Sequence, residues 1–533
     1  MEANLDNAEG IPVYTALSYT WGDRNEDVTI FIDDHPLKIS ENLAYALDDV
    51  VDKAVERSRY LWIDQICINQ QDRAERSNQV RYMGYIYEKA TAVFVWLGKS
   101  GEDHDVAINF LGSWENPAED YGRPSEGVLL SVVRQMSQET LLWGEIIQWA
   151  SKERNWNAMN KLTERLWWER AWVVQEATGP APTYCICGES WISFPDLIQR
   201  LIVIESITKL PGYAYNKLSG RRAFCLLMVL DLRTHQQLRL LDALQFLRSS
   251  CCTDPRDKIY AVFGLVNQEK EIIVPDYTRP LNQVYKDVVR YCIAEYPPHH
   301  RLDFLGYVSG SIEMATKENW PSFVPNWTES PIFDNLKKTT QEYQITDRLY
   351  RASLDFTGNI SLEGDTLSLD AFDVDAVSYV GETCVTEDDM DAVLESWKPE
   401  DPTAGYPTGK TTQEAYLHTL VCDVYRTPNF GLQRGTHFQA ELLNGDANST
   451  DEFLNAHHMR TSMGNTVLCR RIFRTKNGYM GMGPAAMQIG DEIWGFLGGQ
   501  MLYVCQDVCL VIRLFSSGIT SQLVHRYMYG VIR

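Results

Sequence analysis

The sequence lacks the features by which a chain enters or crosses a membrane. Its first residues, MEANLDNAEG, are acidic and contain no apolar core, so we expect no signal peptide. No apolar run in the 533 residues is long enough to span a bilayer. We therefore expect no membrane span and a reducing compartment, cytosolic or nuclear, and of these we predict a cytoplasmic protein.

Basic residues are scarce. The chain has 49 Lys and Arg against 72 Asp and Glu, which gives a formal net charge of -23. Binding to nucleic acid or to an anionic membrane needs clustered Lys and Arg, so we expect no nucleic-acid partner. An acidic surface instead suits a protein partner that has a basic face.

Motifs for metals and nucleotides are missing as well. The 12 cysteines include no CxxC pair and no matching histidine pair, so we expect free thiols and no metal. Lys99 and Lys410 each follow a glycine, as in a phosphate-binding P-loop. However, Val93 and Ala404 stand where that motif needs an earlier glycine. No cofactor is required by any motif of the chain.

The chain is long and apolar enough for several cores. Its length and its hydrophobic share of 44% predict two or three domains. Apolar spacing predicts an α/β region at residues 1–180, a mainly helical region at 181–330 and a β-rich region at 331–533. Within the last region we expect an acidic loop near 387–401 and strands that form a hairpin at 478–497.

The most informative stretch runs from residue 60 to residue 98. Two apolar runs, at 60–63 and 92–97, flank a segment with helical spacing, so this is a βαβ unit whose strands we expect to be parallel neighbours. Residues 15–19 predict another strand, and Ser40 has the side chain of a helix N-cap. Ligands bind where parallel strands end. Polar residues follow the first run: Asp64, Gln65, Asn69, Gln70 and Asp72.

Four motifs stand in the order found in the fungal heterokaryon incompatibility (HET) domain family, which the first third of the chain resembles. They are ALSYTWG at 16–22, LWIDQICINQ at 61–70, a helix leading into VWLG at 95–98, and RAWVVQE at 170–176. The resemblance implies non-self recognition and programmed cell death in a filamentous fungus. It also implies a distant relation to Toll/interleukin-1 receptor (TIR) domains, and hence a TIR-like (flavodoxin-like) parallel sheet in the N-terminal domain.

The TIR relation implies a chemistry. Enzymatic TIR domains cleave NAD at the nicotinamide–ribose bond, with a glutamate on a helix shortly after a tryptophan. Trp172 and Glu176 have that relation, at i and i+4, and would share a helix face. Glu176 would then be the catalytic carboxylate, and NAD would be its substrate. Val173 stands where many TIR domains have cysteine. The alternative is that Glu176 caps its helix or pairs with Arg170.

The strand-end loops would form the pocket. Gly22 would let the backbone approach a ligand, and Tyr19 or Trp21 would stack on one of its rings. By the TIR resemblance, Trp172 would belong to the same pocket. Asp64, Asn69 and Gln70 would bind ribose hydroxyls. The alternatives are a tryptophan that closes the core and side chains that bond their own turn.

A further segment, Asp-Pro-Arg-Asp at 254–257, resembles one that often follows the domain. We expect a structural role for it, in which Asp254 caps a helix and Arg256 pairs with Asp257.

Three functions remain open. The first is a cell-death effector that hydrolyses NAD through Glu176. The second is a non-enzymatic signalling module, which self-associates through the HET domain or docks a protein partner. The third is a small-molecule tailoring enzyme on the same scaffold, since a fold does not fix a function.

Overall fold

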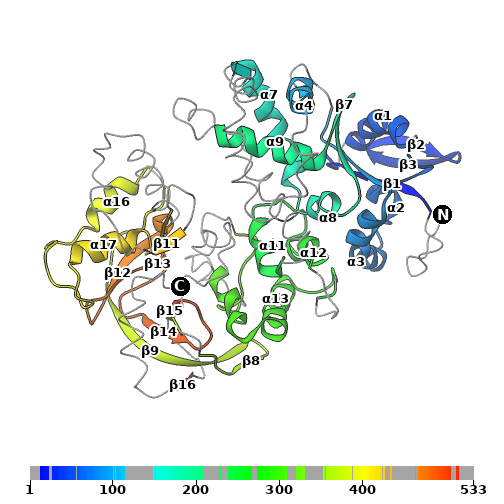
Figure 1. The fold of residues 1–533 in the computed structure, drawn as a ribbon. Coiled ribbons are helices and arrows are strands. Elements are labelled where there is room, and N and C mark those ends of the chain that lie inside the picture. The colour runs from blue at the N-terminus through cyan, green and yellow to red at the C-terminus, as the bar shows by residue number, and fades with distance from the viewer. Residues whose placement is uncertain are drawn as a thin grey trace. The chain divides into compact units, whose positions relative to one another are not determined.

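The structure, a computed structural model, forms two compact units, Met1–Thr278 and Arg279–Arg533, which are described separately (Figure 1). The residues that it describes are 12–22, 27–55, 57–99, 101, 104–113, 148–149, 152–207, 229, 238–266, 273–308, 320–329, 352–353, 356–386, 388–422, 424–426, 432–434, 463, 466–505 and 512–514. The second expected boundary, near residue 330, falls outside these segments. None of the described helices combines the length and hydropathy that a membrane span requires.

The first unit is built on a five-stranded sheet with the order β4-β1-β5-β6-β7. The first four strands of this order are parallel, and β7 pairs antiparallel with β6. Both β1 and β5 are buried along their whole length, as their apolar and β-branched residues require. The strands are β1 (Tyr14–Ser18), β4 (Tyr60–Trp62), β5 (Ala92–Trp96), β6 (Thr183–Cys187) and β7 (Ser190–Ser193).

The two strands of the βαβ unit are parallel, but the expectation that they are neighbours is wrong. β1 lies between them, and Thr15 pairs with Leu61 of β4 on one side and with Ala92 of β5 on the other. The physical reason is burial. β1 is fully buried and needs partners on both edges, whereas β4 is short and half-exposed and suits the edge of the sheet.

Helices cover the two faces of this sheet. α1 (Glu41–Val55) buries an apolar stripe against Leu17 and other residues of one face, and Ser40 caps it by accepting from the Leu43 N–H at 3.3 Å. Ser18 points to the opposite face, because side chains alternate along a strand. That face meets α8 (Val173–Ala177), which packs on α3 (Arg73–Lys89). The other elements are β2 (Asp27–Ile32), β3 (His35–Ser40), α2 (Asp64–Cys67), α4 (His104–Gly112), α7 (Glu153–Thr163), the 3-10 turn η3 (Leu166–Glu169), α9 (Phe194–Ile207), α11 (Leu240–Phe246) and α12 (Asp257–Phe263).

The second unit has the β-rich character that the sequence predicts. Its seven-stranded sheet is built around the long strand β9, which pairs with β8, β12, β14 and β16. All of these pairings are antiparallel except that of β16. The elements are α13 (Leu281–Glu295), η4 (Pro298–His300), η5 (Asp303–Tyr307), β8 (Ile360–Glu363), β9 (Thr366–Val380), α16 (Met390–Ser396), α17 (Thr412–Leu420), β10 (Val424–Arg426), β11 (Leu432–Arg434), β12 (Arg470–Thr475), β13 (Met480–Pro484), β14 (Glu492–Phe496), β15 (Leu502–Cys505) and β16 (Ile512–Leu514).

Two local expectations fail in this unit. The strands in 478–497 are β13 and β14, which do not pair with each other, because β12 pairs with β13 and β14 pairs with both β9 and β15. The acidic segment at 387–401 is not a loop throughout, since it contains α16. The buried side chains of Met390, Val393 and Trp397 lie at helical spacing and hold this helix to the core.

Candidate functional site

The carboxyl end of β1 carries a buried serine that meets the glutamate of α8. Ser18 Oγ donates a hydrogen bond to Glu176 Oε2, and Trp167 Nε1 donates to Ser18 Oγ at 2.8 Å. The side chain of Glu176 is only 1% exposed. A single chain of donors therefore runs from the indole through the hydroxyl to the carboxylate and fixes its orientation.

An arginine lies beside the same carboxylate. Arg170 Nη1 is 3.5 Å from Glu176 Oε2 and also donates to the Tyr19 carbonyl in the loop after β1. The structure thus contains the ion pair that was the alternative interpretation of Glu176. Arg170 also holds the loop after β1 against the segment that precedes α8.

The loops after β1 and β4 are joined through Asp64. This residue begins α2, directly after β4, and is buried. Its Oδ2 accepts from Trp21 Nε1 at 2.8 Å, and its Oδ1 accepts from the Gln65 N–H at 2.7 Å. Tyr19 donates to Gln65 Oε1 at 3.0 Å. Parallel neighbours end at one edge of a sheet, so these loops meet where an open α/β sheet binds ligands.

Two acids share one cation in this group. Burial raises the pKa of Glu176 and of Asp64, and the positive charge of Arg170 opposes the rise in both. Burial also raises the pKa of Tyr19 well above its ordinary value. One guanidinium does not fully offset the burial of two carboxylates, so the pKa of each stays above its ordinary value. We call this group the strand-end cluster; it consists of Ser18, Tyr19, Trp21, Asp64, Trp167, Arg170 and Glu176.

One atom of the strand-end cluster has no partner. Among the described residues, Glu176 Oε1 is a buried oxygen without a hydrogen bond. A buried acceptor left unpaired costs about 1–3 kcal/mol, so native proteins keep few of them. Such an atom is suited to accept a donor from a bound molecule.

The packing of α8 fixes the position of Glu176. Gln175 Nε2 donates to the Tyr260 and Ala261 carbonyls of α12 at 3.0 and 2.8 Å. Gly264 allows this approach, because a Cβ there would lie 2.9 Å from Gln175 Nε2. The helix cannot rotate without breaking these bonds, so Glu176 is held towards β1.

The structure places the expected pocket residues in three groups. Tyr19, Trp21, Asp64 and Glu176 come together in the strand-end cluster. Asn69 and Gln70 bond their own turn: Asn69 Oδ1 accepts from the Gln71 N–H at 3.2 Å, and Gln70 Nε2 donates to the Asp64 carbonyl at 3.1 Å.

Gly22 and Trp172 take partners outside the strand-end cluster. Gly22 has a φ of +77°, and a Cβ there would lie 3.1 Å from Asn42 Cβ, so it serves a tight turn against α1. Trp172 donates a hydrogen bond to Asp257 of α12, whereas Glu176 faces β1.

The sequence did not indicate Ser18 or Trp167 as functional residues. A serine that ends an apolar strand is common, and a tryptophan is usually part of the core. The one available signal is that Ser18 lies inside the ALSYTWG motif.

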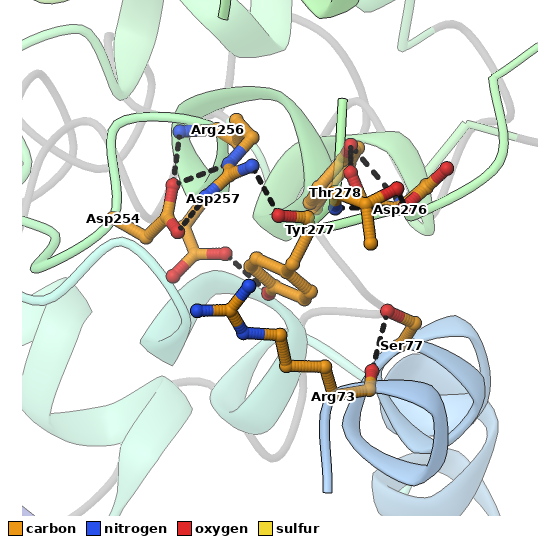
Figure 2. Close-up of polar contacts among 9 residues, drawn as sticks. Arg73, Ser77, Asp254, Arg256, Asp257, Asp276, Tyr277 and Thr278 are labelled. Carbon is orange, nitrogen blue, oxygen red and sulfur yellow. Dashed lines mark hydrogen bonds and ion pairs between the residues drawn. The ribbon is translucent and has the colours of Figure 1, made fainter. Parts of the chain in front are cut away.

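The Asp-Pro-Arg-Asp segment forms a second polar group, shown in Figure 2. Asp254 binds Arg256 through two contacts, Oδ1 to Nε at 2.9 Å and Oδ2 to Nη2 at 2.7 Å. The expected pair of Arg256 with Asp257 is therefore wrong. Asp257 begins α12 and accepts from the Tyr277 hydroxyl at 2.5 Å. Asp254 accepts from the Arg256 N–H at 3.0 Å, two residues on, and thus shapes the turn before the helix.

Burial raises the pKa of Asp257 to about 6. Arg76 stacks on the ring of Tyr277 with its Cζ 4.0 Å from the centroid, which joins α3 to this group. In the part of the chain that the structure describes, no three His, Cys, Asp or Glu residues are placed to hold a metal ion.

Comparisons with protein families find two matches along the chain. The family model of the heterokaryon incompatibility protein (HET) matches residues 14–176. The chain carries a HET domain. That match contains every residue of the strand-end cluster and leaves out the Asp254–Arg256 pair.

A second family model, the Het-6 beta-barrel domain, matches residues 439–511, which include β12 to β15. A curated relative is "Heterokaryon incompatibility protein 6, OR allele" of Neurospora crassa, 29% identical over 371 residues. The alignment covers 59% of this chain, and the chain spans about half, 53%, of the relative. No solved structure matches the chain.

Proposed function

We propose that the chain acts in heterokaryon incompatibility of a filamentous fungus as an effector of programmed cell death, and that its HET domain hydrolyses NAD at a TIR-like site. The HET match and the name of the relative support the first part. The strand order supports the second. Counted along this sheet alone, it is 2-1-3-4-5, the order of flavodoxin-like folds, although β7 runs in the reverse direction.

The observation that carries the proposal is the buried, unpartnered Glu176 Oε1 beside the end of β1. Breaking the bond between nicotinamide and ribose builds positive charge on the ribose. A carboxylate with one free oxygen stabilises that charge or holds a ribose hydroxyl, and a low dielectric strengthens both effects. Ser18 and Arg170 keep its other oxygen in place.

Glu176 is buried, so NAD reaches it only if the segment over the strand-end cluster, η3 and the following Arg170, moves away. Two hydrogen bonds hold this segment in place: Trp167 donates to Ser18 Oγ, and Arg170 donates to the Tyr19 carbonyl. Both residues belong to the 3-10 turn η3 or follow it directly. Once η3 lifts, Asp64 is positioned for ribose hydroxyls and Trp21 for stacking on a ring.

The full burial of Glu176 favours a second candidate. A glutamate that is 1% exposed and paired with Arg170 also suits a purely structural role, in which it holds α8 to the end of β1. In that case the HET domain is a signalling module that works by self-association or by docking a protein, and NAD is untouched.

Expression in cells distinguishes NAD hydrolysis from non-enzymatic signalling. The full chain is expressed in a filamentous fungus as wild type, Glu176→Gln and the matched control Glu164→Gln, a nearby exposed glutamate. NAD hydrolysis predicts that wild type and the control lower cellular NAD and kill, while Glu176→Gln at equal protein level does neither. Cell death with NAD unchanged, or equal killing by Glu176→Gln, contradicts the enzymatic proposal.

A further inference from the structure

The tip of the β2–β3 hairpin is an exposed surface that is apolar and acidic. Phe31 is 71% exposed and Ile32 is 43% exposed. Asp33 and Asp34 form the turn, both with positive φ, 48° and 65°. A two-residue turn with this backbone joins two antiparallel strands tightly, so residues 31–34 form the end of the hairpin. We call residues 31–34 the hairpin tip.

A second exposed surface, at the β7 edge of the same sheet, is aromatic and basic. Trp191 is 56% exposed and packs edge-on against Tyr184 of β6, with ring centroids 5.5 Å apart. The Arg57 guanidinium lies over the Tyr184 ring, 4.3 Å from its centroid. Tyr184 in turn contacts the buried Phe94, so the surface is anchored in the core. We call Arg57, Tyr184 and Trp191 the β7 patch.

The two surfaces complement each other in chemistry. Aromatic residues and arginine are the types that carry most of the energy at protein interfaces, and Phe31 with two aspartates offers them an apolar anchor and opposite charge. The charge match is selective, because two chains of net charge -23 repel unless a basic surface of one meets an acidic surface of the other.

The two surfaces lie on opposite sides of α1. The hairpin tip extends away from the sheet, while β7 forms the far edge of that sheet (Figure 1). They therefore do not meet within one molecule. We propose that the hairpin tip of one copy docks on the β7 patch of a second copy.

This contact is head-to-tail. Each bound copy still presents one free hairpin tip and one free β7 patch, so assembly continues past the dimer into a ring or a filament. The inference concerns assembly alone and stands whether or not the HET domain hydrolyses NAD.

Two variants test it in the full chain: Phe31→Thr, which alters the hairpin tip, and Trp191→Thr, which alters the β7 patch. Threonine suits a strand and removes the aromatic anchor. Analytical ultracentrifugation of wild type is expected to show species larger than a dimer at rising concentration. Each variant alone is expected to raise the dissociation constant about 30-fold. Ile489→Thr, which changes an apolar residue that is 65% exposed elsewhere, is the matched control and should assemble as wild type does.

Mixing the variants gives the sharpest result. Phe31→Thr keeps an intact β7 patch and Trp191→Thr keeps an intact hairpin tip, so an equimolar mixture is expected to form dimers and stop there. Dimer formation also proves that both variants are folded. Arg57→Glu is expected to abolish assembly, and added salt to weaken that of wild type. A wild type that stays monomeric, a mixture that forms no dimer, or variants that assemble as wild type does would each overturn the proposal.

Discussion

Removing the cation of the strand-end cluster is the perturbation whose effect the structure defines best. In Arg170→Met, the side chain keeps its bulk but loses the charge beside Glu176 and the donor to the Tyr19 carbonyl. Breaking a buried ion pair from one side costs about 3–5 kcal/mol, because the remaining charge is left uncompensated. Arg170 is 20% exposed and its contact with Glu176 is 3.5 Å, so we expect about 3 kcal/mol, at the low end.

The cost should depend on pH in a definite direction. Arg170 lowers the pKa of both Glu176 and Asp64, so its removal raises the folded-state pKa of each further. A carboxyl whose folded-state pKa is raised destabilises the protein progressively as pH rises through that value. The destabilisation by Arg170→Met should therefore be largest near pH 8 and fall to less than half near pH 4.5.

Thermal unfolding measures this directly. A loss of about 3 kcal/mol lowers the melting temperature of a unit of this size by roughly 6 °C. Tryptophan fluorescence includes the signals of Trp21 and Trp167 in the strand-end cluster, and the transition that Arg170→Met shifts is assigned to the first unit. Arg73→Met, which changes an exposed arginine of α3, is the control. If Arg170→Met costs no more than this control at pH 8, or costs more at pH 4.5 than at pH 8, the reasoning is refuted.

Two other predictions concern separate features. Burial raises the pKa of Asp257 to about 6, so wild type should lose about 2 kcal/mol of stability between about pH 4.5 and pH 7, and Asp257→Asn should lack this loss in urea titrations. An equal pH dependence in both proteins would refute it. In the second unit, a Cβ at Gly495 would lie 2.0 Å from Phe372 Cζ, so Gly495→Ala should cost about 1–3 kcal/mol by calorimetry. Gly405→Ala, with open space around it, should cost clearly less, and equal losses would contradict the packing argument.

The sequence predicted the local elements of the first unit better than their arrangement. Apolar runs located β1 and β5 to within a residue, and the hydroxyl of Ser40 marked the start of α1. The strand order of the five-stranded sheet could not be predicted from the sequence, because it depends on pairing between residues that are distant in the chain. Nothing within residues 60–98 indicates that β1 inserts between β4 and β5.

Contacts between residues far apart in the sequence also explain the wrong predictions in the second unit. β14 pairs with β9, more than a hundred residues earlier in the chain, in preference to the adjacent β13. The acidic residues around α16 concealed its short buried stripe. Local composition alone reveals neither the pairing of β14 with β9 nor the helix α16.

The candidate site likewise contains residues that motifs predicted and residues that only the three-dimensional contacts reveal. Motifs pointed to Trp21, Asp64 and Glu176, which do come together. Ser18 and Trp167 were missed because their importance comes from which residues they touch. The pairing of Arg256 with Asp254 likewise depends on the turn around Pro255.

Nicotinamide release by the purified full chain tests the central claim most directly. Wild type is incubated with NAD over a range of protein concentrations, and nicotinamide and ADP-ribose are quantified by chromatography. NAD hydrolysis through Glu176 predicts that wild type releases nicotinamide and ADP-ribose in equal amounts. The release is expected to fall about 100-fold or more in folded Glu176→Gln and to be unchanged in Glu164→Gln. No release at any concentration, or release by Glu176→Gln at the wild-type rate, would contradict it.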